Sequence, residues 1–175
     1  MINPVIHGFI ADADNINMCG QRRTLDLLSF VNFLRTERHL NPSHSIVCSN
    51  YLNPMEQVVL EGFGFRCISA RENCDDLVKA EIVRMVEAGV RILTLASGDG
   101  GYAPLLAQLK KAYGLKVHLV ASRHCLSDKL RNAVGVAGIS FIDRFFTRKT
   151  NNRCKLSNFA LSRRPSGPTW SRVAA

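Results

Sequence analysis

Acidic side chains follow strand-like segments of this chain, and they are the residues best suited to chemistry. The acids in question are Asp12, Asp14, Asp75, Asp76 and Asp99. Asp12 directly follows the apolar run 5–11, and Asp99 comes three residues after the apolar run 90–96. The carboxyl ends of strands in an open α/β sheet converge at one edge, where binding sites form. Carboxylates gathered there repel one another unless a cation lies between them, and hard divalent cations prefer oxygen ligands. The sequence therefore predicts a carboxylate–metal site for phosphate chemistry.

Each acid also has a purely structural interpretation. Asp12 or Asp14 could cap the turn after the first strand, as Asx residues often do. Asp75 and Asp76 open a helical pattern, where acids complement the helix dipole without any function. Adjacent helical residues also diverge by about 100°, so this pair is poorly placed to serve one ion together. Asp99 is a stronger candidate, because the glycines of segment 97–101 let the backbone approach a ligand closely.

The elements that must position these acids alternate along the chain. Apolar strand patterns are expected at 5–11, 45–49, 65–69, 90–96, 116–121 and 139–142, and helical patterns near 19–38, 54–61, 76–88, 102–113 and 126–134. Alternation of this kind predicts βαβ units with a mainly parallel sheet covered on both faces. Asn53 before Pro54, Asn73 and Gly114 are expected to mark helix ends. The fold class is therefore an α/β sandwich.

The order and setting of the acidic segments resemble a known family. Residues 9–15 (FIADADN), the Asp75–Asp76 pair at a helix start, and residues 94–106 (TLASGDGGYAPLL) are similar to the NYN domain, a branch of the PIN-like nucleases. The resemblance covers roughly residues 4 to 145 and implies a PIN-like, Rossmann-like α/β/α fold. It also implies hydrolysis of RNA phosphodiester bonds at a carboxylate cluster that binds Mg²⁺ or Mn²⁺.

The resemblance assigns roles to individual residues. Its metal-binding acids match Asp12, Asp99 and one of Asp75 and Asp76, and we expect Asp12, Asp76 and Asp99 to be catalytic. Supporting positions are Asp14, Asn15 and Ser97. One departure matters, because Gly101 stands where the family usually has a second acid. Glu81 or Asp14 could compensate for this loss.

Two other functions remain open. Loss of the acid at Gly101 favours an RNA-binding module with weakened or absent catalysis. A third interpretation is a phosphatase of the haloacid dehalogenase type, because Asp12-Ala13-Asp14 after a strand also resembles the first motif of that family, in which the first Asp is a nucleophile. No acid follows within residues 100–106, where that family would place one.

The charge of the chain is concentrated at its C-terminus. Of the net charge of +9, residues 148–175 contribute +7, from seven basic residues and no acid. We therefore predict a domain at 1–147 and a basic, flexible tail at 148–175 that binds RNA, since basic chain ends attract polyanions. The alternative is a disordered tail that only makes the protein more soluble. Expected nucleic-acid contacts are Arg22, Arg23, Arg123, Arg148, Lys149, Arg153, Lys155, Arg163 and Arg164.

Length and composition indicate the number of domains, the location of the protein in the cell and the state of its cysteines. Its 175 residues suit one domain with a real core. The sequence has no apolar run of about 20 residues and no signal-like N-terminus, so we expect a cytoplasmic protein with no membrane partner. RNA is the expected partner, and a homodimer is possible. The six cysteines show no Cys-x-x-Cys pair, so free thiols are the default expectation.

Overall fold

A parallel sheet forms the centre of the protein. The computed structural model describes residues 5–19, 23–38, 42–70 and 73–148. Six strands pair in parallel in the order β4-β3-β1-β5-β6-β7. Their bounds are β1 Ile6–Asp12, β3 Ser45–Ser49, β4 Arg66–Ser69, β5 Val90–Ala96, β6 Lys116–Ala121 and β7 Ile139–Phe141. This is the strand order of doubly wound dinucleotide-binding folds, so the predicted Rossmann-like α/β class is confirmed.

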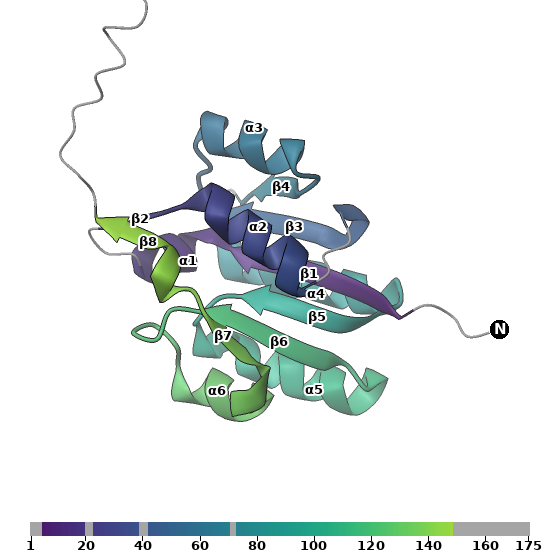
Figure 1. The fold of residues 1–175 in the computed structure, drawn as a ribbon. Coiled ribbons are helices and arrows are strands. Elements are labelled where there is room, and N and C mark those ends of the chain that lie inside the picture. The colour runs from purple at the N-terminus through teal and green to yellow at the C-terminus, as the bar shows by residue number, and fades with distance from the viewer. Residues whose placement is uncertain (1–4, 20–22, 39–41, 71–72, 149–175) are drawn as a thin grey trace, which may run out of the picture.

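Helices cover both faces of the sheet, as Figure 1 shows. The α-helices are α1 Ala13–Cys19, α2 Leu27–Arg38, α3 Pro54–Gly62, α4 Cys74–Glu87, α5 Ala103–Tyr113 and α6 Asp128–Val134. Single 3-10 turns are η1 Pro42–His44, η2 Gly100–Tyr102, η3 Val136–Gly138 and η4 Asp143–Phe145. No helix among the described residues is long and apolar enough to span a membrane.

The expected helix signals act where they were predicted. The side chain of Asn53 accepts a hydrogen bond from the backbone N–H of Met55, and that of Asn73 accepts one from Asp75, so each satisfies a free donor at a helix N-terminus. Gly114 ends α5 in the left-handed conformation, with φ 65°. These local interactions set the starts of α3 and α4 and the end of α5.

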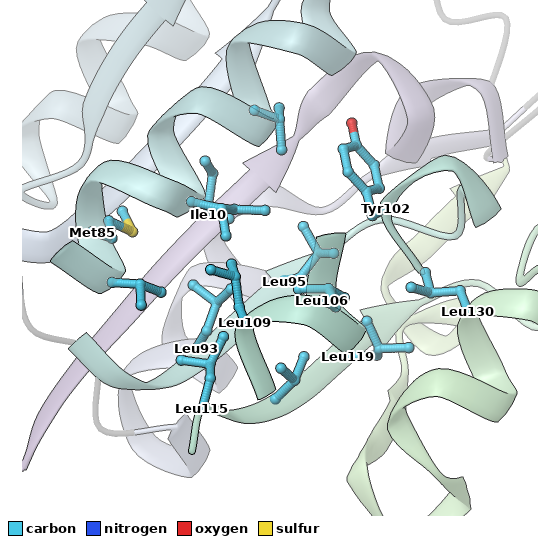
Figure 2. Close-up of a cluster of buried hydrophobic side chains, with 14 of the residues drawn as sticks. Ile10, Met85, Leu93, Leu95, Tyr102, Leu106, Leu109, Leu115, Leu119 and Leu130 are labelled. Carbon is cyan, nitrogen blue, oxygen red and sulfur yellow. The ribbon is translucent and has the colours of Figure 1, made fainter. Parts of the chain in front are cut away.

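Alternating strand residues divide the core into two clusters. Ile10 and Leu95 pack with α4 and α5, whereas Phe9, Ala11 and Ala96 pack with α2 and α3. Figure 2 shows the first cluster, in which Tyr102 lies beside the leucines and its hydroxyl oxygen is at the end of the ring remote from Leu106. Residues 12 and 97 share the parity of Ile10 and Leu95, so their side chains belong to the α4–α5 side.

The single helix expected near 19–38 is wrong. The structure has α1 at Ala13–Cys19, then the short strand β2 at Arg23–Leu25, then α2 at Leu27–Arg38. Strand β2 pairs antiparallel with β8, Phe146–Arg148, in a separate two-stranded sheet. Asp26 explains the interruption, because its carboxylate accepts hydrogen bonds from the backbone N–H and the hydroxyl of Ser29 at the start of α2.

Candidate active site

The site lies at the point where the strand order reverses. The chain runs outward from β1 through β3 to β4, and returns to β5 on the other side of β1. Ala11 of β1 pairs with Ala96 of β5, which places the next residues, Asp12 and Ser97, side by side at the carboxyl ends of the strands. Crevices at such reversal points are where α/β sheets bind ligands.

Asp12 is the buried centre of this site, with a relative exposure of 2%. Its Oδ1 accepts a hydrogen bond from the backbone N–H of Asn15 at 3.0 Å, and its Oδ2 accepts one from the hydroxyl of Tyr102 at 2.9 Å. The hydroxyl of Ser97 lies 3.5 Å from the same Oδ2. Burial raises the pKa of Asp12, and the Asn15 and Tyr102 hydrogen bonds oppose the shift without cancelling it.

Tyr102 joins Asp12 to a second acid. The Tyr102 hydroxyl also lies 3.1 Å from Oδ1 of Asp75, at the start of α4. Burial, reinforced by the charges of Asp12 and Asp75, raises the pKa of Tyr102, so the phenol stays protonated. One hydroxyl carries one proton and donates fully to one carboxylate only. The second carboxylate, that of the half-buried Asp75, therefore lacks a full hydrogen bond from this hydroxyl, which favours the approach of a cation.

Asp14 completes the acidic cluster from α1. Its carboxylate accepts hydrogen bonds from the hydroxyl of Ser49 and from the backbone N–H of Asn50, both at the end of β3. Ligand atoms of Asp12, Asp14 and Cys74 all lie within 4.8 Å of one another. The Cys74 thiol is directed at Oδ1 of Asp12 at 3.9 Å, and burial raises its pKa. A protonated thiol is a poor partner for a hard cation, so the two carboxylates are the useful ligands.

The three acids expected further along the chain have different surroundings. Asp75 reaches the cluster through Tyr102, whereas Asp76 accepts a hydrogen bond from the Asn73 amide and pairs with Lys79 at 3.6 Å, with its side chain 72% exposed. Both of these partners, Asn73 and Lys79, belong to the start of α4. The carboxylate of Asp99 accepts a hydrogen bond from the backbone N–H of Gly101 at 2.9 Å, and so caps the turn η2.

Asn15 and Ser97 connect Asp99 to the cluster through the backbone. The Asn15 Oδ1 accepts a hydrogen bond from the backbone N–H of Gly98 at 2.8 Å. The Ser97 hydroxyl, beside Asp12, accepts one from the backbone N–H of Asp99 at 3.2 Å. The segment 97–99 is thereby held against α1 and β1 at the same edge of the sheet.

Glu81 and Asp14 are the two acids that could compensate for the missing acid at Gly101, and their surroundings differ. Glu81 forms ion pairs with Arg66 and Arg84, each at 2.6 Å, so its charge is already neutralised. The carboxylates of Asp14 and Asp12 lie within 4.8 Å of each other. Asp14 is thus the better placed of the two.

Two contributors were missed in the sequence. The Tyr102 hydroxyl and the Ser49 hydroxyl were not expected at the site, although Tyr102 follows the glycine-rich turn within two residues of Gly100. An aromatic residue with a hydroxyl at a buried helix start is a usable signal, because a buried phenol needs a hydrogen-bond partner. Ser49 offered no such signal, since serine is common at strand ends.

The expectation of free thiols is wrong for two of the six cysteines. Cys19 and Cys125 form a disulfide with a Cα–Cα distance of 5.7 Å, within the usual range. Cys48, Cys67 and Cys74 are free, and Cys154 lies outside the described residues.

The basic residues expected to contact RNA are only partly described. Arg123 is exposed and lies over the ring of Phe141, 4.6 Å from its centroid. Arg23 and Arg148 pair through their backbones in β2 and β8. Arg22 and the tail residues Lys149, Arg153, Lys155, Arg163 and Arg164 lie outside the described residues.

The chain is similar to known proteins in sequence and in fold. The NYN domain family model matches residues 9–137, which include the whole acidic cluster. A solved structure of a protein of unknown function from Vibrio parahaemolyticus is similar, with a TM-score of 0.65 and 19% identity, covering 81% of this chain and 95% of that one. At that identity the likeness shows the fold alone. No curated protein matches the chain. The chain belongs to the NYN domain family, a branch of the PIN-like nucleases.

Proposed function

We propose that this protein is a divalent-metal-dependent ribonuclease that hydrolyses RNA phosphodiester bonds at the Asp12 cluster. The observation that carries the proposal is the approach of the Asp12 and Asp14 carboxylates to within 4.8 Å of each other, with Asp75 joined to Asp12 through the Tyr102 hydroxyl. Among the described residues, no lysine or arginine forms an ion pair with any of these three acids. A buried carboxylate without a cationic partner is unfavourable. The family match supplies the reaction class.

The donor set fits a hard cation. The cluster offers carboxylate oxygens, which Mg²⁺ and Mn²⁺ prefer, and these residues come from β1, α1 and α4, so the fold gathers them before any ion arrives. We assign Asp12, Asp14 and Asp75 as the residues that would hold it. A bound divalent cation would neutralise charge on the scissile phosphate and make water a stronger nucleophile.

The surrounding residues orient the cluster. The Tyr102 hydroxyl and the Asn15 N–H fix the two oxygens of Asp12, and the Ser49 hydroxyl fixes Asp14. Partners of this kind hold the ligands in the productive geometry. Asp99, expected from the sequence to be a catalytic, metal-binding acid, is proposed instead as a supporting residue at the rim, tied to Ser97 through its backbone. Asp76 is proposed to hold the side chain of Asn73, which caps α4.

Basic groups near the site would contact the phosphates of RNA. Lys79 lies 5.9 Å from the centroid of the Tyr102 ring, and Arg123 is exposed in the loop after β6. Phosphate contacts from lysine and arginine supply much of the affinity for nucleic acid and weaken with salt. The basic tail, residues 148–175, is proposed to add to this affinity.

One observation favours the second candidate, an RNA-binding module without turnover. Gly101, where the family usually has an acid, contributes only its backbone N–H to Asp99. Such a module would show salt-sensitive RNA binding that does not depend on Asp12. The phosphatase interpretation has no support from the family match and is not carried further.

The deciding experiment is cleavage of a labelled single-stranded RNA with Mg²⁺ or Mn²⁺, with and without a chelator. We expect metal-dependent cleavage that falls more than about 100-fold in Asp12→Asn, since even residues that only orient metal ligands contribute about 10- to 100-fold. Asp128→Asn is the matched control, because Asp128 is an exposed acid paired with Arg131. Binding without cleavage, unchanged in Asp12→Asn, would overturn the enzyme and support the module.

A further inference from the structure

A disulfide crosses the carboxyl edge of the sheet beside the acidic cluster. It joins Cys19, the last residue of α1, to Cys125 in the loop between β6 and α6, across 106 residues of sequence. Helix α1 carries Asp14 and Asn15 of the site. The bond therefore ties the helix that supplies site residues to a loop of the opposite half of the sheet.

Gly98 lies between the two segments that the disulfide joins. Its N–H donates to Asn15 Oδ1 on α1 at 2.8 Å, and its carbonyl accepts from the N–H of Ser127, in the loop, at 2.9 Å. The glycine is buried, and a Cβ atom there would overlap the carbonyl oxygen of Cys125. The peptide of Gly98 is thus held on one side by α1 and on the other by the Cys125 loop.

We propose that the Cys19–Cys125 disulfide is a redox-controlled clamp on the Gly98 peptide, and through it on the site segment 97–99. Its effect on catalysis rests on the proposed ribonuclease function, whereas the clamp itself does not. The Gly98 peptide links α1 to the Cys125 loop through one hydrogen bond on each side, so the disulfide adds a covalent link to a weak connection. Disulfides that are accessible to solvent are the ones that act as labile or regulatory bonds.

The reaction is thiol–disulfide exchange with a dithiol reductant. One reductant thiolate attacks a sulfur of the pair, which breaks the Cys19–Cys125 bond and forms a mixed disulfide. The second reductant thiol displaces the protein sulfur, so the reductant leaves as a disulfide and its two electrons and two protons end on Cys19 and Cys125. A disulfide oxidant reverses each step.

The position of the bond suits such exchange. Both cysteines are partly exposed, and the neighbouring Arg123 and His124 are exposed. The other described cysteines do not compete: Cys48 is buried, and desolvation raises its pKa to about 12 and that of Cys67 to about 11. Cys74 is buried as well, with its pKa raised by burial. These thiols remain protonated and weakly nucleophilic.

Reduction of the disulfide would loosen the Gly98 peptide more than it would affect Asp12 at the centre of the site. The start of the loop stays attached through Asp143, which accepts hydrogen bonds from the Ser122 hydroxyl and the Arg123 N–H. The Asp12–Tyr102 hydrogen bond involves neither joined segment. The reduced Cys19 sulfur, 3.8 Å from Asn15 Oδ1, gains a proton and becomes a weak second donor to the oxygen that holds Gly98.

The test measures amide hydrogen exchange of the full chain by NMR, oxidised and then reduced with dithiothreitol. We expect exchange of the Gly98 and Ser127 amides to accelerate by at least about tenfold on reduction, because local opening controls exchange. The amide of Met55, bonded to Asn53, is the internal control and should not change. Cys19→Ser and Cys125→Ser should exchange rapidly without reductant, whereas Cys67→Ser should respond as the natural chain does.

Three outcomes would overturn the clamp. One is equal exchange at Gly98 and Ser127 in both redox states. Another is alkylation of Cys19 and Cys125 as free thiols after equilibration with oxidised glutathione, and the third is a bond that survives excess dithiothreitol under native conditions.

RNA cleavage with Mg²⁺ should be several-fold faster in the oxidised protein. If neither form cleaves RNA, the ribonuclease proposal fails while the exchange data still decide the clamp.

Discussion

The hydroxyl of Tyr102 lies 2.9 Å from Oδ2 of Asp12, and both side chains are buried. The two residues are 90 positions apart, at the ends of different strand–helix units. Because this phenol also reaches Asp75, it sets the distance between two acids that would otherwise move apart by repulsion. The acidic cluster is therefore organised by a neutral residue.

Removing this hydroxyl should weaken both the fold and the site. We expect Tyr102→Phe to lower the free energy of unfolding by about 1.5–3 kcal/mol, the usual contribution of a hydrogen bond to a charged group. Mn²⁺ affinity should fall as well, because Asp12 loses its positioning. Urea denaturation and calorimetric titration measure the two effects. Tyr113→Phe, at a 42% exposed position, is the control and should change stability by less than about 0.5 kcal/mol.

The raised pKa of Asp12 predicts a pH dependence of stability without metal. The pKa of Asp12 in the folded protein lies above the ordinary value of 3.8. The contribution of this carboxyl group to the free energy of unfolding is therefore most favourable below pH 3.8, and it is lost as the pH rises through the folded pKa. In the presence of a chelator, Asp12→Asn should therefore become increasingly stable relative to the natural chain from about pH 4 to pH 7.

Asp26 provides a control of opposite sign for that measurement. Hydrogen bonds from Ser29 lower the pKa of Asp26 below its ordinary value of 3.8. The contribution of Asp26 to the free energy of unfolding is therefore present above pH 3.8, and it is lost as the pH falls through the folded pKa. Asp26→Asn should lose stability relative to the natural chain at neutral pH and match it in acid. Parallel pH profiles for the two variants would contradict our account of Asp12.

Asp75 and Asp76, the neighbouring acids of α4, should differ in their contribution to metal affinity. Asp75→Asn removes the carboxylate that shares Tyr102 with Asp12, and we expect Mn²⁺ affinity to fall at least about 10-fold. Asp76→Asn changes an exposed acid bonded to Asn73 and Lys79, so affinity should stay within about twofold. Titration followed by electron paramagnetic resonance measures both, and a larger loss in Asp76→Asn would reverse the assignment.

Gly101 has room for the acid that the family usually carries. A Cβ atom there would lie 3.5 Å from Oδ1 of Asp99, an ordinary contact. Gly101→Asp should therefore fold and add a carboxylate beside Asp99, and we expect tighter Mn²⁺ binding by about two- to tenfold. Gly101→Asn, which adds similar volume without charge, should not show this gain. Equal affinity in both variants would mean that this position does not face the ion.

Gly98 and Gly62 should respond oppositely to alanine. At Gly98 a methyl group meets the backbone of Cys125, which has no room to yield, and we expect a loss of more than about 2 kcal/mol in unfolding free energy. At Gly62, the last residue of α3, nothing lies within 4 Å, and the gain should be about 0.5–1 kcal/mol. Thermal or urea unfolding of the two variants tests the packing of the site loop.

The sequence alone determined the features that depend on near neighbours. The six strands of the parallel sheet and the ends of α3, α4 and α5 could be predicted, because apolar runs and caps such as Asn53 and Asn73 act within a few residues. Asp12 and Asp99 could be placed at one edge of the sheet for the same reason. The division of 13–38 into α1, β2 and α2 could not, since β2 exists by pairing with β8, more than 100 residues away.

Only the tertiary structure decided which acids meet. Asp75 and Asp76 are equivalent in sequence, and the direction of α4 relative to Tyr102 distinguishes them. The Cys19–Cys125 disulfide likewise has no local signal, because the two cysteines approach only when α1 and the β6–α6 loop meet at the same edge. Local patterns specify backbone conformation, whereas contacts between distant side chains depend on how the completed sheet brings its edges and loops together.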